Sequence, residues 1–374
     1  MSNDFYLIAG WRPIAAHRAD TLSKTKFDKM VKGATVEPFV KLNEGKEYHI
    51  HGIQPITNNP GSYWMMIEGD VNSLVFSANG EIEESTEDCL GSADYLESGI
   101  VVGKYKVLFF AKREAVLVDQ GRLVCKLPFK LWISKSVYGI MLYRHPFIIK
   151  HMMYVIGEGQ QLFRCNMQAI TDQLSRHEAD KSMQLGMTFK DHIVLIDKDV
   201  KDCCVDLKTG TMYYLNEAGI VMSGNKRFVC MERNRTTSKD RCYVAIAAIG
   251  MSIVVASIKD LDNKKAEINF ELFNCKGRLT HELSTTTESE FEFVTYLKAF
   301  ELRRCKMLVS ARLIGYCDLY AIHCSKLHVI KSRLQISVAT NCSIWDLLVE
   351  VDKNKADIIF VGFEIFNRIS ISIK

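Results

Sequence analysis

Short apolar runs separated by polar turns recur along the chain from about residue 48 to its end. The runs are rich in Val, Ile, Phe and Tyr and stop at Gly, Asn, Asp or Ser, which is the pattern of β-strands joined by turns. Helical periodicity is scarce. The best amphipathic window covers residues 21–32, with an apolar face of Leu22, Phe27, Met30 and Val31. The pattern therefore predicts an all-β fold preceded by a short helix.

One local unit, consisting of an apolar strand, a polar turn and a second strand, occurs seven times. A further apolar strand generally lies about 8–12 residues before each unit, as the inner strands of a propeller blade would. The seven units cover residues 74–83, 116–127, 161–174, 203–215, 268–283, 319–330 and 360–373.

The spacing of these units is close to that of propeller blades. Their turns lie about 41, 46, 42, 68, 49 and 42 residues apart, and four-stranded blades repeat at about 40–50 residues. We attribute the long gap to an insertion near residues 221–241. A sandwich uses about seven to nine strands, whereas this pattern offers about 25 to 30. Two tandem sandwiches would hold as many strands but would not require this period.

The chain is accordingly predicted to be a seven-bladed β-propeller over residues 46–374, with an N-terminal extension over residues 1–45. Only 6 prolines and no long Gly/Ser/Pro-rich linker interrupt it. Two interpretations of the extension stay open. Residues 4–9 (DFYLIA) could add a strand that closes the ring, although residues 335–373 already have room for a four-stranded last blade. Alternatively, the extension is a partner-binding arm that contains the helix. We favour a combination of the two.

The turn formed by residues 205–210 (VDLKTG) is similar to the turn between the third and outer strands of WD40 blades, and residues 118–121 and 273–277 resemble it more weakly. Over about residues 48–374 the chain thus resembles a divergent WD40-like propeller. It has a Trp-Asp pair only at Trp345-Asp346, in an upstream strand, and lacks the Gly-His pair that opens a WD40 repeat. The resemblance implies a scaffold or adaptor, and the usual Asp-His network is not expected.

Motifs for catalysis and metal binding are missing from the sequence. It contains no CxxC, HExxH, GxSxG or Gly-rich phosphate loop. His49 and His51, with Glu47, would share one face of a strand, but no further ligands accompany them. Adjacent Cys203 and Cys204 would point to opposite faces. We therefore assign no catalytic residue, no cofactor and no metal ligand.

Composition indicates an intracellular protein. Twelve cysteines are irregularly spaced, mostly inside apolar runs, where free cysteine behaves as a small hydrophobe. This usage is typical of a reducing compartment, the cytoplasm or the nucleus. The first ten residues do not resemble a secretory signal, and no apolar stretch reaches the length of about 18 residues that a transmembrane helix needs.

Charge is mild overall, at +4, but it is unevenly distributed, and residues 12–32 and 303–306 are also basic. Residues 81–97 are acidic, and the predicted insertion is basic. The residues predicted to bind a phosphate group or an acidic protein surface are Lys226, Arg227, Arg233, Arg235, Lys239 and Arg241.

The favoured function is a non-enzymatic protein-interaction scaffold that is a subunit of an intracellular complex. The alternative is a propeller that binds nucleic acid or phosphoinositide lipid through these basic residues. A second alternative is a propeller hydrolase with carboxylates around the axis.

Overall fold

The computed structural model describes most of the chain in separate segments. These are residues 24–38, 49–55, 63–68, 72–76, 82–86, 96–110, 114–119, 122–130, 133–135, 141–143, 146–177, 189–206, 209–223, 226–230, 241–249, 252–261, 265–286, 294–302, 305–312, 316–322, 329–335, 344–352, 354–362 and 365–372.

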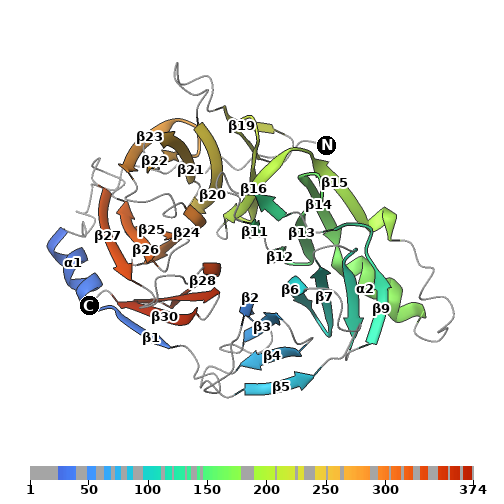
Figure 1. Cartoon of the computed structure of the whole chain (residues 1–374). Coiled ribbons are helices and arrows are strands. Elements are labelled where there is room, and N and C mark those ends of the chain that lie inside the picture. The colour runs from blue at the N-terminus through green and yellow to red at the C-terminus, as the bar shows by residue number, and fades with distance from the viewer. Residues whose placement is uncertain are drawn as a thin grey trace, which may run out of the picture.

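Within these residues, seven four-stranded sheets follow one another along the chain, and a two-stranded hairpin lies between the second and third of them. Figure 1 shows the sheets side by side around a ring. The prediction of an all-β propeller is therefore confirmed. Every strand pair in the described segments is antiparallel, as expected for sheets built from consecutive hairpins.

The first sheets, from the inner to the outer strand, lie early in the chain. They contain β2 (His49–Pro55), β3 (Tyr63–Glu68), β4 (Asn72–Phe76) and β5 (Ile82–Thr86); then β6 (Leu96–Val102), β7 (Tyr105–Phe110), β8 (Val116–Asp119) and β9 (Arg122–Lys126); then the hairpin of β10 (Ile133–Lys135) and β11 (Met141–Tyr143); then β12 (Phe147–Ile149), β13 (Met152–Gly157), β14 (Gln161–Asn166) and β15 (Ile193–Asp197).

The remaining sheets are ordered in the same way. They contain β16 (Val200–Asp206), β17 (Thr211–Asn216), β18 (Ile220–Ser223) and β19 (Lys226–Cys230); then β20 (Arg241–Ile249), β21 (Ser252–Leu261), β22 (Lys265–Phe273) and β23 (Leu279–Thr286); then β24 (Val294–Leu302), β25 (Cys305–Arg312), β26 (Tyr316–Ile322) and β27 (Val329–Gln335); and last β28 (Ile344–Asp352), β29 (Lys355–Gly362), β30 (Ile365–Ser372) and β1 (Thr35–Pro38).

The core consists of apolar layers between neighbouring sheets, as strand β21 illustrates. Ile253 and Val255 pack with residues of β17 and β18 in the preceding sheet. Val254 and Ala256 point the other way and pack with residues of the following sheet, including Leu308 of β25. Because both faces of the strand are covered, its apolar run is continuous. Burial of each Ile, Val or Leu side chain in these layers stabilises the fold by about 1.5–3 kcal/mol.

The hairpin units of the sequence do not all occupy the same place in a sheet. Residues 74–83, 116–127, 268–283 and 319–330 fall on the third and outer strands. The turn at residues 205–210, however, joins β16 to β17, the first and second strands of a sheet. The placement of this turn between third and outer strands was wrong, and the displaced hairpin explains the long gap of about 68 residues. The unit at residues 360–373 forms the second and third strands.

The insertion predicted near residues 221–241 is also corrected. Its described part, up to residue 230, forms β18 and β19, which complete an ordinary sheet. The extra segment lies instead between β14 and β15. It includes helix α2 (Met167–His177) and the short 3-10 helix η2 (Lys190–His192), where the sequence had indicated a strand. Helix α2 lies on the outer side of the ring (Figure 1).

The N-terminal extension takes part in the last sheet. Helix α1 (Lys24–Lys32) buries Phe27 and Met30 in the apolar layer between the last two sheets. The following strand β1 pairs with β30 in the register Thr35 to Ser370 through Pro38 to Asn367. The last sheet was expected to draw four strands from residues 335–373; the structure takes three from there and its fourth from residues 35–38. The strand suggested at residues 4–9 lies outside the described residues.

Two turns show different demands on glycine. Gly219, between β17 and β18, has a φ of +71°, and a Cβ atom there would lie 2.3 Å from Cε2 of Tyr243. Gly103, between β6 and β7, has a φ of +62°, but a Cβ atom there would meet nothing within 4 Å. Another residue at Gly219 would therefore strain the backbone and clash with Tyr243, whereas another residue at Gly103 would only strain the backbone.

Candidate interaction sites

The predicted basic residues belong to a connection between two sheets. Lys226 and Arg227 begin the outer strand β19, and Arg241 begins β20, the inner strand of the next sheet. Arg233, Arg235 and Lys239 lie between these strands and outside the described residues. We call residues 226–241 the basic connection. Both of its ends lie in paired strands. Lys226 and Arg227 pair with Ser223 and Met222 of β18. Arg241 pairs with Lys259 of β21.

The acidic residues 81–97 occupy the corresponding place three sheets earlier in the ring. Their described parts are β5, an outer strand, and the beginning of β6, the next inner strand. Residues 87–95 lie outside the described residues. The two most strongly charged stretches of the sequence are thus both connections from the outer strand of one sheet to the inner strand of the next.

Neighbouring sheets are joined by a repeated aspartate contact that the sequence did not reveal. Asp202 and Asp346 each follow a one-residue bulge in an inner strand, at Lys201 and Trp345 respectively. One carboxylate oxygen of each accepts the N–H of the next residue, at 2.9 Å for Asp202 and 2.7 Å for Asp346.

The second oxygen of each carboxylate reaches the inner strand of the neighbouring sheet. Oδ2 of Asp202 accepts the N–H of Ile246 at 2.9 Å, and Oδ2 of Asp346 accepts that of Ile53 at 3.1 Å. Ile246 and Ile53 occupy equivalent positions, since each comes second after a bulge in its own strand. We call these contacts aspartate clamps. Charged acceptors make stronger hydrogen bonds than neutral ones, so the clamps hold the sheets in fixed positions.

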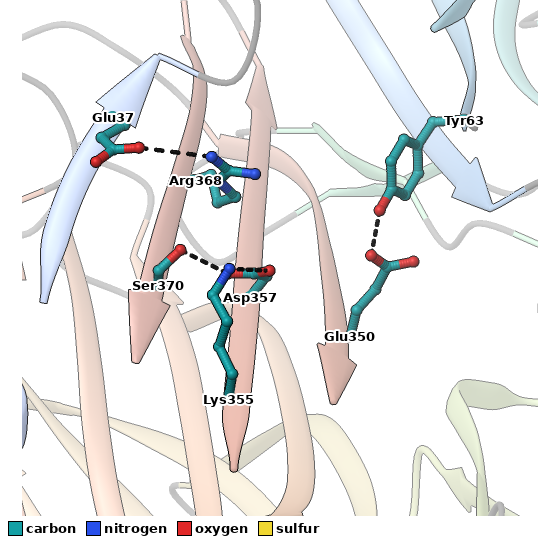
Figure 2. A network of polar contacts seen from close by, with 7 residues as sticks. All are labelled: Glu37, Tyr63, Glu350, Lys355, Asp357, Arg368 and Ser370. Carbon is teal, nitrogen blue, oxygen red and sulfur yellow. Dashed lines mark hydrogen bonds and ion pairs between the residues drawn. The ribbon is translucent and has the colours of Figure 1, made fainter. Parts of the chain in front are cut away.

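The clamp of Asp346 lies at the seam where the last sheet meets the first. Figure 2 shows further polar contacts there. The Tyr63 hydroxyl of β3 donates to the Glu350 carboxylate of β28, and burial together with this carboxylate raises the pKa of Tyr63. The phenol therefore stays protonated and continues to donate.

A second set of contacts in Figure 2 fixes the closing strand and its neighbours. The Arg368 guanidinium of β30 lies 3.5 Å from the Glu37 carboxylate of β1. On β29, the Asp357 carboxylate accepts from Lys355 Nζ at 2.9 Å and from Ser370 Oγ at 2.5 Å. The seam thus combines a strand pair, a clamp and side-chain contacts between segments far apart in the sequence.

Three of the described cysteine thiols are buried in the core, and their burial makes them unreactive. Burial raises the pKa of Cys125 and Cys165 to about 12, and it raises the pKa of Cys317 as well, with the nearby Asp318 charge as a smaller cause. Thiols of this kind remain protonated at neutral pH and are poor nucleophiles. Their place in the apolar core matches the expectation that cysteine here acts as a small hydrophobe.

The histidine pair of the sequence falls on an irregular strand. His49 begins β2, but His51 lies at the bulge between Ile50 and Gly52, so strict alternation of faces is interrupted there. Within the described segments, no three His, Cys, Asp or Glu side chains group together as metal ligands would. Nor does a helix of those segments have the length and apolar character needed to cross a membrane.

Two of the six large aliphatic side chains that are exposed among the described residues are neighbours on one outer strand. Val194 and Leu195 of β15 are 44% and 42% exposed although they are adjacent and face opposite sides of the strand. The sequence predicts an apolar strand over residues 192–196, as an inner strand of the next blade. The structure makes β15 the outer strand of the preceding sheet instead.

No family model matches the sequence, and no curated protein does. Solved structures do share the fold. The WD40 β-propeller domain of Doa1 is 11% identical, with 90% of this chain and 97% of that chain covered and a TM-score of 0.50. A chain in the mitotic checkpoint complex is 8% identical, with 90% and 97% covered and a TM-score of 0.51. YCF48 bound to the D1 peptide is 8% identical, with 91% and 97% covered and a TM-score of 0.51. At these identities the likeness concerns the fold alone, which is that of a β-propeller.

Proposed function

We propose that this chain is a non-enzymatic protein-interaction scaffold and a subunit of an intracellular multi-protein complex. The observation that carries the proposal is the basic connection, held at both ends by the ordered strands β19 and β20. Like-charged side chains on a connection between blades repel one another and do not contribute to the core. An acidic partner surface would neutralise them, which favours fast and oriented association.

The closed ring supports a scaffold role. The aspartate clamps and the seam hold strands of different sheets together through Asp202, Asp346 and the pairing of β1 with β30. The ring therefore fixes the positions of β19 and β20, the strands at the two ends of the basic connection, and this lowers the conformational freedom that those strands lose when a partner binds.

Two observations support a non-enzymatic protein in a reducing compartment. The Asp202 and Asp346 carboxylates are engaged by backbone N–H groups, and the thiols of Cys125 and Cys165 are buried in the core. Seven described cysteines are free, among them the neighbours Cys203 and Cys204. We propose a location in the cytoplasm or the nucleus, where thiols stay reduced.

The test compares two full-length variants, tagged and purified from the native cells. In the first, the six residues Lys226, Arg227, Arg233, Arg235, Lys239 and Arg241 are changed to Ala. The control loses the same charge at six exposed positions of other elements, namely Lys29, Lys32, Lys126, Lys265, Lys276 and Arg278.

We expect the wild type and the control to retain a stoichiometric protein partner in high salt, and the first variant to lose it. Equal retention by both variants would refute a role for the basic connection. Recovery of only RNA or phosphoinositide, lost steeply as salt rises, would refute the scaffold and establish the nucleic-acid or lipid alternative.

A further inference from the structure

Strand β15 is an outer strand that lacks the usual protection of a sheet edge. It pairs with β14 on one side, and among the described residues no strand pairs with its other side. Charged side chains normally discourage pairing at such an edge. Each of the six other outer strands has a charged residue among its first four positions, whereas β15 begins with the aliphatic run 193–196 (IVLI).

Both faces of β15 are open at its centre. Val194 and Leu195 point to opposite sides of the strand and are 44% and 42% exposed. Val194 lies beside Arg164 of β14, and Leu195 lies beside Phe163. An apolar layer over a single face would cover only one of the two. A strand placed beside β15 would give each of them a neighbour, because residues that oppose each other in a strand pair share a face.

The surroundings of β15 are basic where the strand begins. Three exposed cations of the described residues lie there, namely Lys190 of η2, Arg176 of α2 and Arg164 of β14. Helix α2 reaches η2 through the contact of Gln173 Oε1 with His192 Nε2, at 3.0 Å. Arg176 comes three positions after Gln173 and therefore shares its side of the helix. Asp191 offsets only one of these charges.

The surroundings of β15 are acidic where the strand ends. Asp197 and Asp199 flank Lys198 there, and Lys198 offsets only one of them. The Glu217 N–H donates to the carbonyl oxygen of Asp199 at 2.8 Å, but the Glu217 carboxylate is paired with Lys201 Nζ at 3.0 Å. The edge strand is thus an aliphatic run between a basic and an acidic end.

We propose that β15 is a docking strand for an extended segment of a protein partner, which adds antiparallel to its open edge. The segment has an apolar, β-branched centre, basic residues before that centre and acidic residues after it. Running opposite to β15, such a segment places its basic residues at Asp197 and Asp199 and its acidic residues at Lys190 and Arg176. Antiparallel pairing is slightly more stable than parallel pairing, and strand addition to a sheet edge is a common mode of peptide recognition.

A second copy of β15 does not fit this edge. Around a two-fold axis, residues that oppose each other in an antiparallel pair come from the same face, so the axis passes through a residue. With the axis at Val194, Asp191 lies opposite Asp197; with the axis at Leu195, it lies opposite Asp199. Like charges that oppose each other destabilise a strand pair. The charges therefore favour a different chain.

This docking strand extends the proposed scaffold function but does not share its site. Strand β15 belongs to the third sheet, whereas the basic connection joins the fourth sheet to the fifth. Figure 1 shows β15 on the outer side of the ring. The tests use the purified full chain and synthetic peptides, so their failure would leave the role of the basic connection untouched.

The first test is fluorescence anisotropy with a labelled peptide of sequence KKTVVTEE, acetylated at its N-terminus and amidated at its C-terminus. We expect saturable binding, weakened about fivefold in Leu195→Lys, which removes the apolar contact on one face. The matched control is Leu279→Lys, which changes another outer-strand leucine that is 42% exposed and should bind as the wild type does. No binding up to about 1 mM chain, or equal affinities of the two variants, would overturn the proposal.

The second test separates strand addition from simple apolar contact. In an antiparallel pair, alternate residues of a strand direct their N–H and C=O groups toward the partner strand. One central valine of the peptide therefore donates its N–H to β15, and the other directs its N–H away. N-methylation of one valine should abolish binding, and N-methylation of the other should leave it unchanged. Equal behaviour of the two methylated peptides would show that the peptide does not pair with β15.

The third test addresses the charges. The peptide EETVVTKK has the same composition with its charged ends exchanged. We expect it to bind about fivefold more weakly than KKTVVTEE, and the difference should shrink as salt rises. Equal affinities of the two peptides at low salt would show that the ends of β15 do not select the partner.

Amide hydrogen exchange identifies what covers the edge. We expect rapid exchange in β15 of the chain alone and slower exchange when KKTVVTEE is bound. Slow exchange in the chain alone at every concentration would mean that a segment of the same chain covers β15. Protection that increases with protein concentration would mean that a second copy does. Either result would overturn the proposal.

Discussion

The aspartate clamp at the seam can be tested by changing Asp346 to Ala. The carboxylate accepts the N–H groups of Leu347 and Ile53, both of which belong to buried residues. Removal of the carboxylate leaves both donors without that acceptor and far from water. A hydrogen bond to a charged group contributes about 1.5–3 kcal/mol. Because the two bonds share one acceptor and are not independent, we expect a loss of about 3–5 kcal/mol in the free energy of unfolding.

Two comparisons separate this effect from a general loss of charge. Asp346→Asn keeps one acceptor oxygen and should lose about half as much. Asp352→Ala removes an exposed carboxylate at the end of the same strand, and it should change stability by less than about 0.5 kcal/mol. Urea unfolding followed by circular dichroism measures all three.

The location of the damage is a second readout. Asp346 joins the first and last sheets, whereas Asp202 joins sheets that are consecutive in the chain. In Asp346→Ala we therefore expect faster amide hydrogen exchange in β2 and in the closing strand β1. In Asp202→Ala the increase should fall around Ile246. If Asp346→Ala is as stable as the wild type, or if its exchange rises equally in all sheets, the clamp does not hold the seam.

Three further changes follow from burial, space and protonation. Phe27→Ala should destabilise the fold by about 3–5 kcal/mol in urea unfolding, because it removes the buried anchor of α1; a loss below 1 kcal/mol would mean that α1 does not brace the last sheet. Gly219→Ala should lower the melting temperature more than Gly103→Ala. Both changes strain the backbone by about 1–2 kcal/mol, but only the change at Gly219 also places a methyl group against the Tyr243 ring. Equal decreases in the melting temperature would contradict this. The thiols of Cys125 and Cys165 have a pKa near 9.0 in the unfolded chain and about 12 in the folded protein. Between these pH values the unfolded chain binds fewer protons, so the free energy of unfolding should fall by up to about 1.4 kcal/mol per pH unit for each thiol. Urea unfolding at alkaline pH should show a shallower fall in Cys165→Ala than in the wild type, and an equal fall would exclude that thiol as a cause.

The propeller could be predicted because its repeat is local. A turn such as Asn274–Gly277 needs only its own residues: the Asn274 side chain accepts the N–H of Lys276, and Gly277 supplies the positive φ. Which two strands of a sheet a given hairpin joins could not be predicted in the same way. Every hairpin of an antiparallel sheet has similar turn chemistry, so the turn at residues 205–210 gave no sign that it joined the first two strands.

Helix α2 shows a signal that the strand interpretation overlooked. Met167, Ile170 and Leu174 are spaced three and four residues apart and are all buried on one side of the helix. Asn166 stands just before them, and its side chain accepts the N–H of Ala169 at 3.1 Å, as a helix N-cap does. Both features are readable in the sequence.

The clamps, by contrast, could not be found from sequence. Asp346 and Ile53 lie 293 residues apart, and the bulge at Trp345 that turns the aspartate toward the next sheet depends on strand register. The Trp-Asp pair drew attention only through its likeness to a WD40 motif, and its role here is different. Contacts of this kind arise from the closed ring and not from any local pattern.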